Sequence, residues 1–121
     1  VRDLGMGAVN FSPLAYGVLT GKYDQGLPPG SRLDRVEWTR KRYYTETTLQ
    51  RVKQMKDLAD RASRTRAQLA LAWIAAHPAI SSVITGATRV EQLQENLGAL
   101  AVDMTDELKS ALDNLFPLEN D

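Results

Sequence analysis

The sequence contains no cysteine, which excludes a disulfide framework and any metal site built on thiolates. It also lacks excess charge, because 15 basic and 15 acidic side chains cancel. A neutral chain has no long-range attraction for nucleic acid or anionic membranes. The longest apolar run, around residues 69–76, is far shorter than the roughly 20 residues that span a bilayer. We therefore expect a soluble, cytoplasmic protein that neither binds nucleic acid nor inserts into a membrane.

Histidine is almost absent as well, since His77 is the only one. It precedes Pro78, where a predicted helix ends, and a histidine at that place favours capping or a dipole interaction over catalysis. We assign no catalytic role and no metal site to any residue of the chain.

Apolar spacing predicts two strands and four helices. Short apolar or β-branched runs at residues 8–11 and 81–85 are typical of buried strands. Apolar residues recur at helical spacing, with charged residues between them, over residues 49–62, 65–77, 88–100 and 105–116.

The predicted helix starts have capping signals. Thr65-x-x-Gln68 and Thr88-x-x-Glu91 have the form of capping boxes. In the third helix, we expect the apolar face to point into the core, and this face consists of Val90, Leu93, Leu97 and Leu100.

Residues 16–44 contain four of the eight glycines and two of the five prolines, and they show no clear periodicity. We predict a long loop. Loops of this length inside compact domains are uncommon, and they are either binding segments and lids or disordered stretches.

The order of elements predicts an α/β fold with a parallel sheet covered by helices. A pair of parallel strands alone would leave two open edges and an uncovered sheet face. The first residues also resemble a cut edge rather than a natural start. We therefore expect the chain to be the last part of a larger array of βα units.

The turn at residues 85–89 is a candidate phosphate site. Gly86 allows the backbone to approach a ligand, the first N–H groups of a helix lack intrahelical partners, and Arg89 adds a positive charge. The alternative is an ordinary βα turn in which Thr88 caps the helix. Gln92, Glu95 and Asn96 follow on the same helix, as either a solvated face or a ligand-binding face.

Longer motifs resemble the aldo-keto reductases. Residues 86–96 read GATRVEQLQEN, which is similar to the segment that this family places after its eighth barrel strand to hold the adenosine half of NADP(H). Residues 11–23 read FSPLAYGVLTGKY and, with residues 26–32, resemble the seventh strand and its loop. The most similar subgroup contains the voltage-gated potassium channel β-subunits and their bacterial relatives.

The resemblance implies a fold and a domain boundary. Residues 1–121 would be the C-terminal part of a single aldo-keto reductase domain, comprising the seventh and eighth strands, with their helices, of a TIM (β/α)8 barrel. The barrel is incomplete in the sequence as given.

The resemblance also implies binding roles for NADP(H). The Phe11 ring would stack on the nicotinamide, as aromatic geometry allows. Contacts to the ribose and pyrophosphate region would come from Ser12, Pro13 and Leu14. The predicted loop would close over the pyrophosphate like a clasp, with cations supplied by Lys22 and Arg32.

The remaining implied contacts follow the second strand. Thr88 and Arg89 would meet the 2′-phosphate, next to the backbone at Gly86. The adenosine would be faced by Gln92, Glu95 and Asn96.

The family reduces a carbonyl by hydride transfer, with a tyrosine acid assisted by lysine, aspartate and histidine from earlier strands. Those segments do not occur here. The implied function is the NADP(H)-binding part of an oxidoreductase of aldehydes or ketones, inactive by itself. Two alternatives remain open: a β-subunit-like regulatory protein that binds NADP(H) and docks on a channel-type partner, or a truncated, non-catalytic βα module that forms homo-oligomers.

Overall fold

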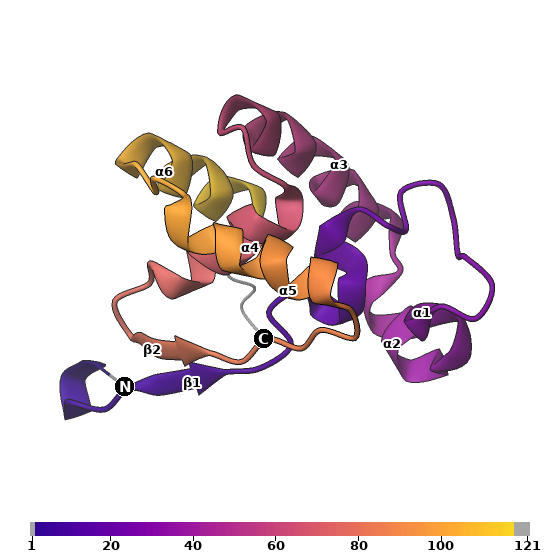
Figure 1. Cartoon of the computed structure of the whole chain (residues 1–121), viewed down its shortest axis with the longest axis horizontal. Coiled ribbons are helices and arrows are strands. Elements are labelled where there is room, and N and C mark those ends of the chain that lie inside the picture. The colour runs from indigo at the N-terminus through magenta and orange to yellow at the C-terminus, as the bar shows by residue number, and fades with distance from the viewer. Residues whose placement is uncertain (1, 118–121) are drawn as a thin grey trace.

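The structure, a computed structural model, describes residues 2–117. It is a mixed α/β arrangement with more helix than strand (Figure 1). In chain order, the elements are the 3-10 helix η1 (Arg2–Leu4), β1 (Ala8–Asn10), the 3-10 helix η2 (Ala15–Thr20), α1 (Arg32–Arg35), α2 (Glu37–Tyr43), α3 (Glu46–Arg61), α4 (Arg66–Ala75), β2 (Ile80–Val83), α5 (Val90–Leu97), the 3-10 helix η3 (Gly98–Ala101) and α6 (Asp106–Leu115).

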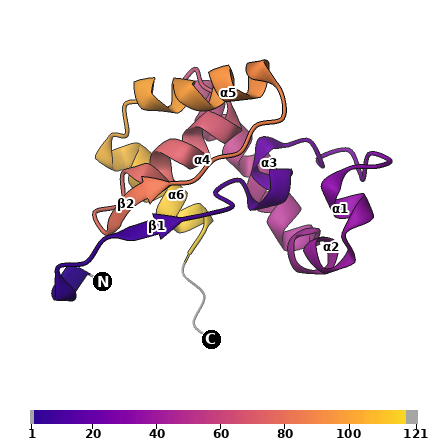
Figure 2. The same cartoon turned by 60° about the horizontal axis from the view of Figure 1, so that its bottom comes forward.

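The strands β1 and β2 pair in parallel, as the order of elements predicted. Ala8 is opposite Ile80 and Asn10 is opposite Val83, with an irregularity between Ala8 and Val9. Figure 2 shows three layers, with α4 between α5 and this small sheet, while α1 and α2 lie at the end of the molecule away from the strands. Because the strands are parallel, the segments that follow them leave the sheet at the same edge.

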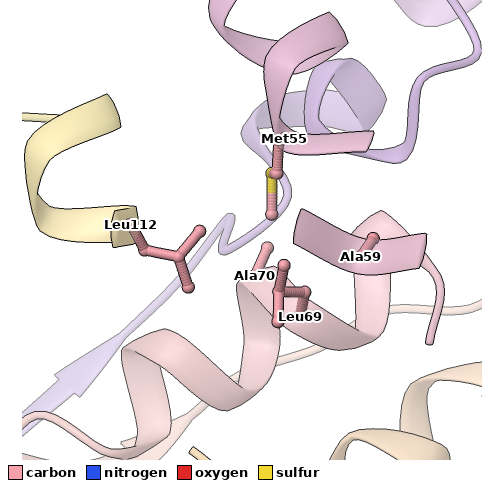
Figure 3. Close-up of a cluster of buried hydrophobic side chains, with 5 residues drawn as sticks. All are labelled: Met55, Ala59, Leu69, Ala70 and Leu112. Atoms are coloured by element: carbon pink, nitrogen blue, oxygen red, sulfur yellow. The ribbon is translucent and has the colours of Figure 1, made fainter. Parts of the chain in front are cut away.

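The helix α4 is the centre of the main core. Its residues 69–72 are all buried. Figure 3 shows Leu69 and Ala70 of α4 beside Met55 and Ala59 of α3 and Leu112 of α6. Full burial of a leucine or methionine side chain stabilises a fold by about 1.5–3 kcal/mol. These contacts hold the consecutive helices α3 and α4 against α6, which lies much later in the sequence.

Two of the predicted helix starts are confirmed. At α4, the Thr65 side chain accepts a hydrogen bond from the backbone N–H of Gln68, and Gln68 Oε1 accepts one from the backbone N–H of Thr65. At α6, the Thr105 hydroxyl accepts a hydrogen bond from the Leu108 N–H over 3.2 Å. Each cap satisfies N–H groups that have no partner inside the helix.

The prediction of a long loop over residues 16–44 was wrong. This region contains most of η2 and the two short helices α1 and α2. A second buried cluster holds it against α3, formed by Val18, Tyr23, Leu33 and Val52. Helices this short depend on tertiary contacts for their stability, so they leave little periodic signal in the sequence.

The prediction that α5 buries its apolar face was also wrong. Its apolar side chains are exposed by 67% at Val90, 48% at Leu93 and 56% at Leu97, and Leu100 in η3 is exposed by 87%. The helical periodicity is correct, but nothing in residues 2–117 covers this face. An open groove of about 290 Å3 runs beside it between α4, β2 and η3.

Within the described part of the chain, no helix combines the length and the apolar character that a membrane span requires.

Candidate functional site

A cleft of about 720 Å3 opens between the segment after β1, the start of α1 and the turn that leads into α5. Ligand pockets usually measure about 300–1,000 Å3. The cleft brings together all the site residues predicted from the sequence except Phe11: Ser12, Pro13, Leu14, Lys22, Arg32, Gly86, Thr88, Arg89, Gln92, Glu95 and Asn96. Residues that lie more than 70 positions apart thus face one space.

Phe11 follows β1 and does not line this cleft. Its side chain is 74% exposed. The predicted stacking residue therefore directly precedes Ser12, which lines the cleft, but is not itself part of the cleft walls.

The first wall follows β1 and has an unusual backbone. Ser12, Ala15 and Tyr16 have φ angles of 52°, 49° and 58°. This left-handed conformation costs a non-glycine residue about 1–3 kcal/mol and persists only where the surroundings impose it. Backbone strain of this kind clusters at ligand sites.

Lys22 lies over the end of this wall. Its side chain packs on Gly17, where an added Cβ would lie 2.8 Å from Lys22 Cε. Gly17 also has a φ of 96°, so any larger residue would be both strained and in collision. The Lys22 ammonium lies 5.5 Å from the centre of the Tyr23 ring. A glycine at position 17 is thus what allows the lysine to lie along the cleft.

The second wall is α1. Arg32 and Arg35 both line the cleft, while Leu33 between them is fully buried and anchors the helix. The Leu33 N–H donates to the Tyr23 hydroxyl over 3.3 Å. The Arg32 guanidinium lies 5.1 Å from the centre of the Tyr16 ring.

Sequence reasoning missed several lining residues, including Tyr16, Ser31 and Arg35. The three-residue spacing from Arg32 to Arg35 was a usable signal, because residues at that spacing share a helix face. The prediction of a loop over this region left that spacing unused.

The third wall is the turn into α5, and here the predicted capping box was wrong. Thr88 does not cap the helix, because its N–H and its hydroxyl both donate to Gln92 Oε1, over 2.9 Å and 3.1 Å. Arg89 occupies the N-cap position and, within residues 2–117, its side chain makes no capping hydrogen bond. The first N–H groups of α5 therefore lack a side-chain cap at the edge of the cleft.

The helix α5 continues this wall. Glu95 and Asn96 are half-buried and line the cleft. Gln68 Nε2 donates to the Glu95 carbonyl over 2.9 Å, which ties α5 to α4.

The charged residues that line the cleft are mostly cations. Glu95 is the one acid among the described lining residues, and the cations are Lys22, Arg32, Arg35 and Arg89. Several cations around one concave surface raise the local concentration of anions, and arginine in particular matches phosphate oxygens. This arrangement suits a ligand that carries phosphate groups.

His77 lies in the exposed turn after α4 and does not line the cleft. Its Nδ1 accepts a hydrogen bond from the Ala79 N–H over 3.1 Å. This contact lies within the turn and involves no carbonyl of α4, so the capping or dipole role of His77 stays a prediction.

Comparison with known proteins identifies the protein family of this chain. The sequence model of the Aldo/keto reductase family matches residues 1–116. The chain belongs to this family.

The chain is also similar to one particular curated protein. The chain is 48% identical over 101 residues to the probable voltage-gated potassium channel subunit beta of Arabidopsis thaliana. The aligned part covers 81% of this chain and 31% of that protein. The chain therefore spans about a third of the length of the curated relative that it matches.

Proposed function

We propose that residues 1–121 form the C-terminal part of an aldo-keto reductase barrel, with β1 and β2 as its seventh and eighth strands, and that the cleft binds NADP(H). The observation that carries this proposal is the convergence of residues 12–32 and 85–96 on one cation-lined cleft. The activity would be the reduction of aldehydes or ketones by hydride transfer, in the cytoplasm.

Each wall of the cleft would contact a different part of the dinucleotide. Lys22 and Arg32 face the cleft from the first two walls and would pair with the pyrophosphate. Thr88 and Arg89, at the start of α5, would meet the 2′-phosphate. The buried Ser31 Oγ lines the cleft and has no hydrogen-bond partner among the described residues, so it is available to a ligand oxygen.

The nicotinamide, when bound, would supply the hydride. Reduction of a carbonyl also needs an acid that protonates the developing alkoxide. Tyr16 is the one tyrosine among the residues that line the cleft, and its ring is packed against Trp38 and Tyr43. We propose that the acid lies outside this chain, so that these 121 residues alone do not turn over an aldehyde.

A second candidate is a regulatory protein that binds NADP(H) and docks on a channel-type partner. The similarity to a probable channel β-subunit favours this alternative. A third is a truncated, non-catalytic module that forms homo-oligomers. The mass of the intact polypeptide distinguishes the third from the other two, because only the third would consist of these two strand units alone.

The test of the proposed function is a titration of the complete barrel with NADPH, followed by nicotinamide fluorescence. Saturable binding, together with turnover of an aldehyde, is the expected result. Binding without turnover of any carbonyl compound would favour the regulatory candidate. Absence of saturable binding would overturn the proposal.

A further inference from the structure

The ring of Tyr16 is the centre of a small aromatic cluster at the edge of the cleft. Its centroid lies 5.4 Å from that of Trp38, with the rings nearly perpendicular at 84°, and 5.6 Å from that of Tyr43. The Arg32 guanidinium lies 5.1 Å from the same ring centre. Tyr16 belongs to η2, whereas these three partners belong to α1 and α2. One side chain therefore joins the two walls.

The backbone at Tyr16 shows that this ring position is imposed. Its φ and ψ angles are 58° and 32°, inside the left-handed region. A tyrosine enters that region only where other contacts offset the strain, and edge-to-face aromatic pairs are favourable contacts of that kind. The contacts with Trp38 and Tyr43 thus fix the position and orientation of the Tyr16 ring.

The face of the Tyr16 ring can hold a guanidinium group without occupying the N–H donors of that group. Arginine stacks on an aromatic ring through the flat face of its side chain, and its five N–H donors remain free in the plane. Arg32 also lines the cleft. A stacked Arg32 is therefore still able to bind two oxygens of a phosphate group.

The short helix α1 cannot fix this side chain by itself. It has four residues and is anchored on its other side by the buried Leu33. Leu33 holds the backbone, while an arginine side chain without a further contact would lose entropy on binding an anion. We propose that Tyr16 is a positioning residue, which holds Arg32 ready for the pyrophosphate of a dinucleotide. This inference rests on the proposed function of the cleft.

Three variants of the complete barrel test the inference by titration with NADPH and with inorganic pyrophosphate. Tyr16→Phe keeps the ring and should bind both within about twofold of the unsubstituted protein. Tyr16→Asn removes the ring but tolerates the left-handed backbone. It should weaken both affinities about two- to fivefold, the size of an exposed cation–π contact. Arg42→Ala is the control, because Arg42 stacks on Tyr43 but does not line the cleft.

The decisive measurement is the affinity of the double variant for NADPH and for pyrophosphate. In an Arg32→Ala background, Tyr16→Asn should cause no further loss, since the residue through which Tyr16 acts is gone. An equal loss in both backgrounds, or no loss in either, would overturn the inference.

A ligand-free measurement keeps this inference separate from the proposed function. The NMR signals of the Arg32 side chain should be shifted upfield by the Tyr16 ring and should lose that shift in Tyr16→Asn. Unshifted signals in the unsubstituted protein would contradict the positioning role. A protein that binds pyrophosphate with this dependence on Tyr16, but does not bind NADPH, would retain the positioning role and disprove the proposed cofactor.

Discussion

Arg66 of α4 forms an ion pair with Asp24, with 2.8 Å between Nη2 and Oδ2. The two side chains are only 13% and 17% exposed. Arg66 Nη1 also donates to the Val52 carbonyl of α3 over 3.1 Å. The backbone at Gly21 passes so close to this guanidinium that a side chain there would collide with it. This ion pair ties the segment that carries Lys22 to the helical core.

We predict that Arg66→Ala destabilises the complete barrel by about 3 kcal/mol, because it leaves the Asp24 carboxylate largely buried without its partner. Urea denaturation measures the change. The control is Lys56→Ala, which removes an ion pair with Asp60 on the exposed face of α3 and should leave the denaturation midpoint nearly unchanged. Equal midpoints for the two variants would contradict the role of the buried pair.

The second prediction concerns the choice between cofactors. Arg89→Ala should remove a charge-assisted contact with the 2′-phosphate, which is worth about 1.5–3 kcal/mol, or roughly ten- to hundredfold in NADPH affinity. NADH has no 2′-phosphate, so its affinity should hardly change. Paired titrations of both cofactors test this. Equal binding of NADPH and NADH before and after the substitution would disprove a 2′-phosphate site here.

The third prediction concerns the clasp. Residues 17–32 include two cations that line the cleft, Lys22 and Arg32. Gly26 and Gly30 in this segment have φ angles of 129° and 75°, and no heavy atom lies near the place of an added Cβ. We expect NADPH to slow hydrogen exchange of the amides between Gly17 and Arg32. The amides of α4 serve as the internal reference. Unchanged exchange in residues 17–32 would show that this segment does not close on the cofactor.

The fourth prediction is a pH dependence. A hydrogen bond from Lys109 holds the pKa of Asp113 below its usual value of 3.8, and a second one from Trp73 Nε1, 2.9 Å away, acts in the same direction. A pKa that is lower in the folded state stabilises the fold above pH 3.8, and this contribution disappears as the pH falls through the folded value.

Carboxyl-selective NMR titration should therefore give Asp113 a pKa below 3.8. Lys109→Met should raise this pKa more than Trp73→Phe does, because the hydrogen bond from Lys109 is the larger cause. The opposite order would contradict the assignment of causes.

The fifth prediction concerns the uncovered face of α5. We expect the isolated 121-residue chain to self-associate, because its strand edges and the apolar residues beside the groove have no cover within residues 2–117. Sedimentation of the double variant Leu97→Asn, Leu100→Asn should show less association. Leu4→Asn is the matched control, because Leu4 is also exposed but lies in η1. A monomeric chain that unfolds cooperatively and reduces an aldehyde with NADPH would disprove the proposal of an incomplete barrel.

The sequence predicted well where the signal is local. The capping box at Thr65 and the cap at Thr105 depend on groups only three residues away, and both are present in the structure. The parallel pairing of β1 and β2 also followed, since a long connection that contains helices excludes a hairpin. The motifs at residues 11–32 and 86–96 were specific enough to predict the family that the comparison confirmed.

The sequence by itself therefore determined the long helices, their order and the family. Only the tertiary structure decided how residues 16–44 fold, that the Thr88 hydroxyl donates a hydrogen bond to Gln92 Oε1, and that the Arg32 guanidinium lies over the Tyr16 ring. The physical reason is the range of the interactions. Caps and apolar periodicity act within one or two turns. The short helices, the side-chain stacking and the exposure of α5 depend instead on which groups meet after the chain has folded.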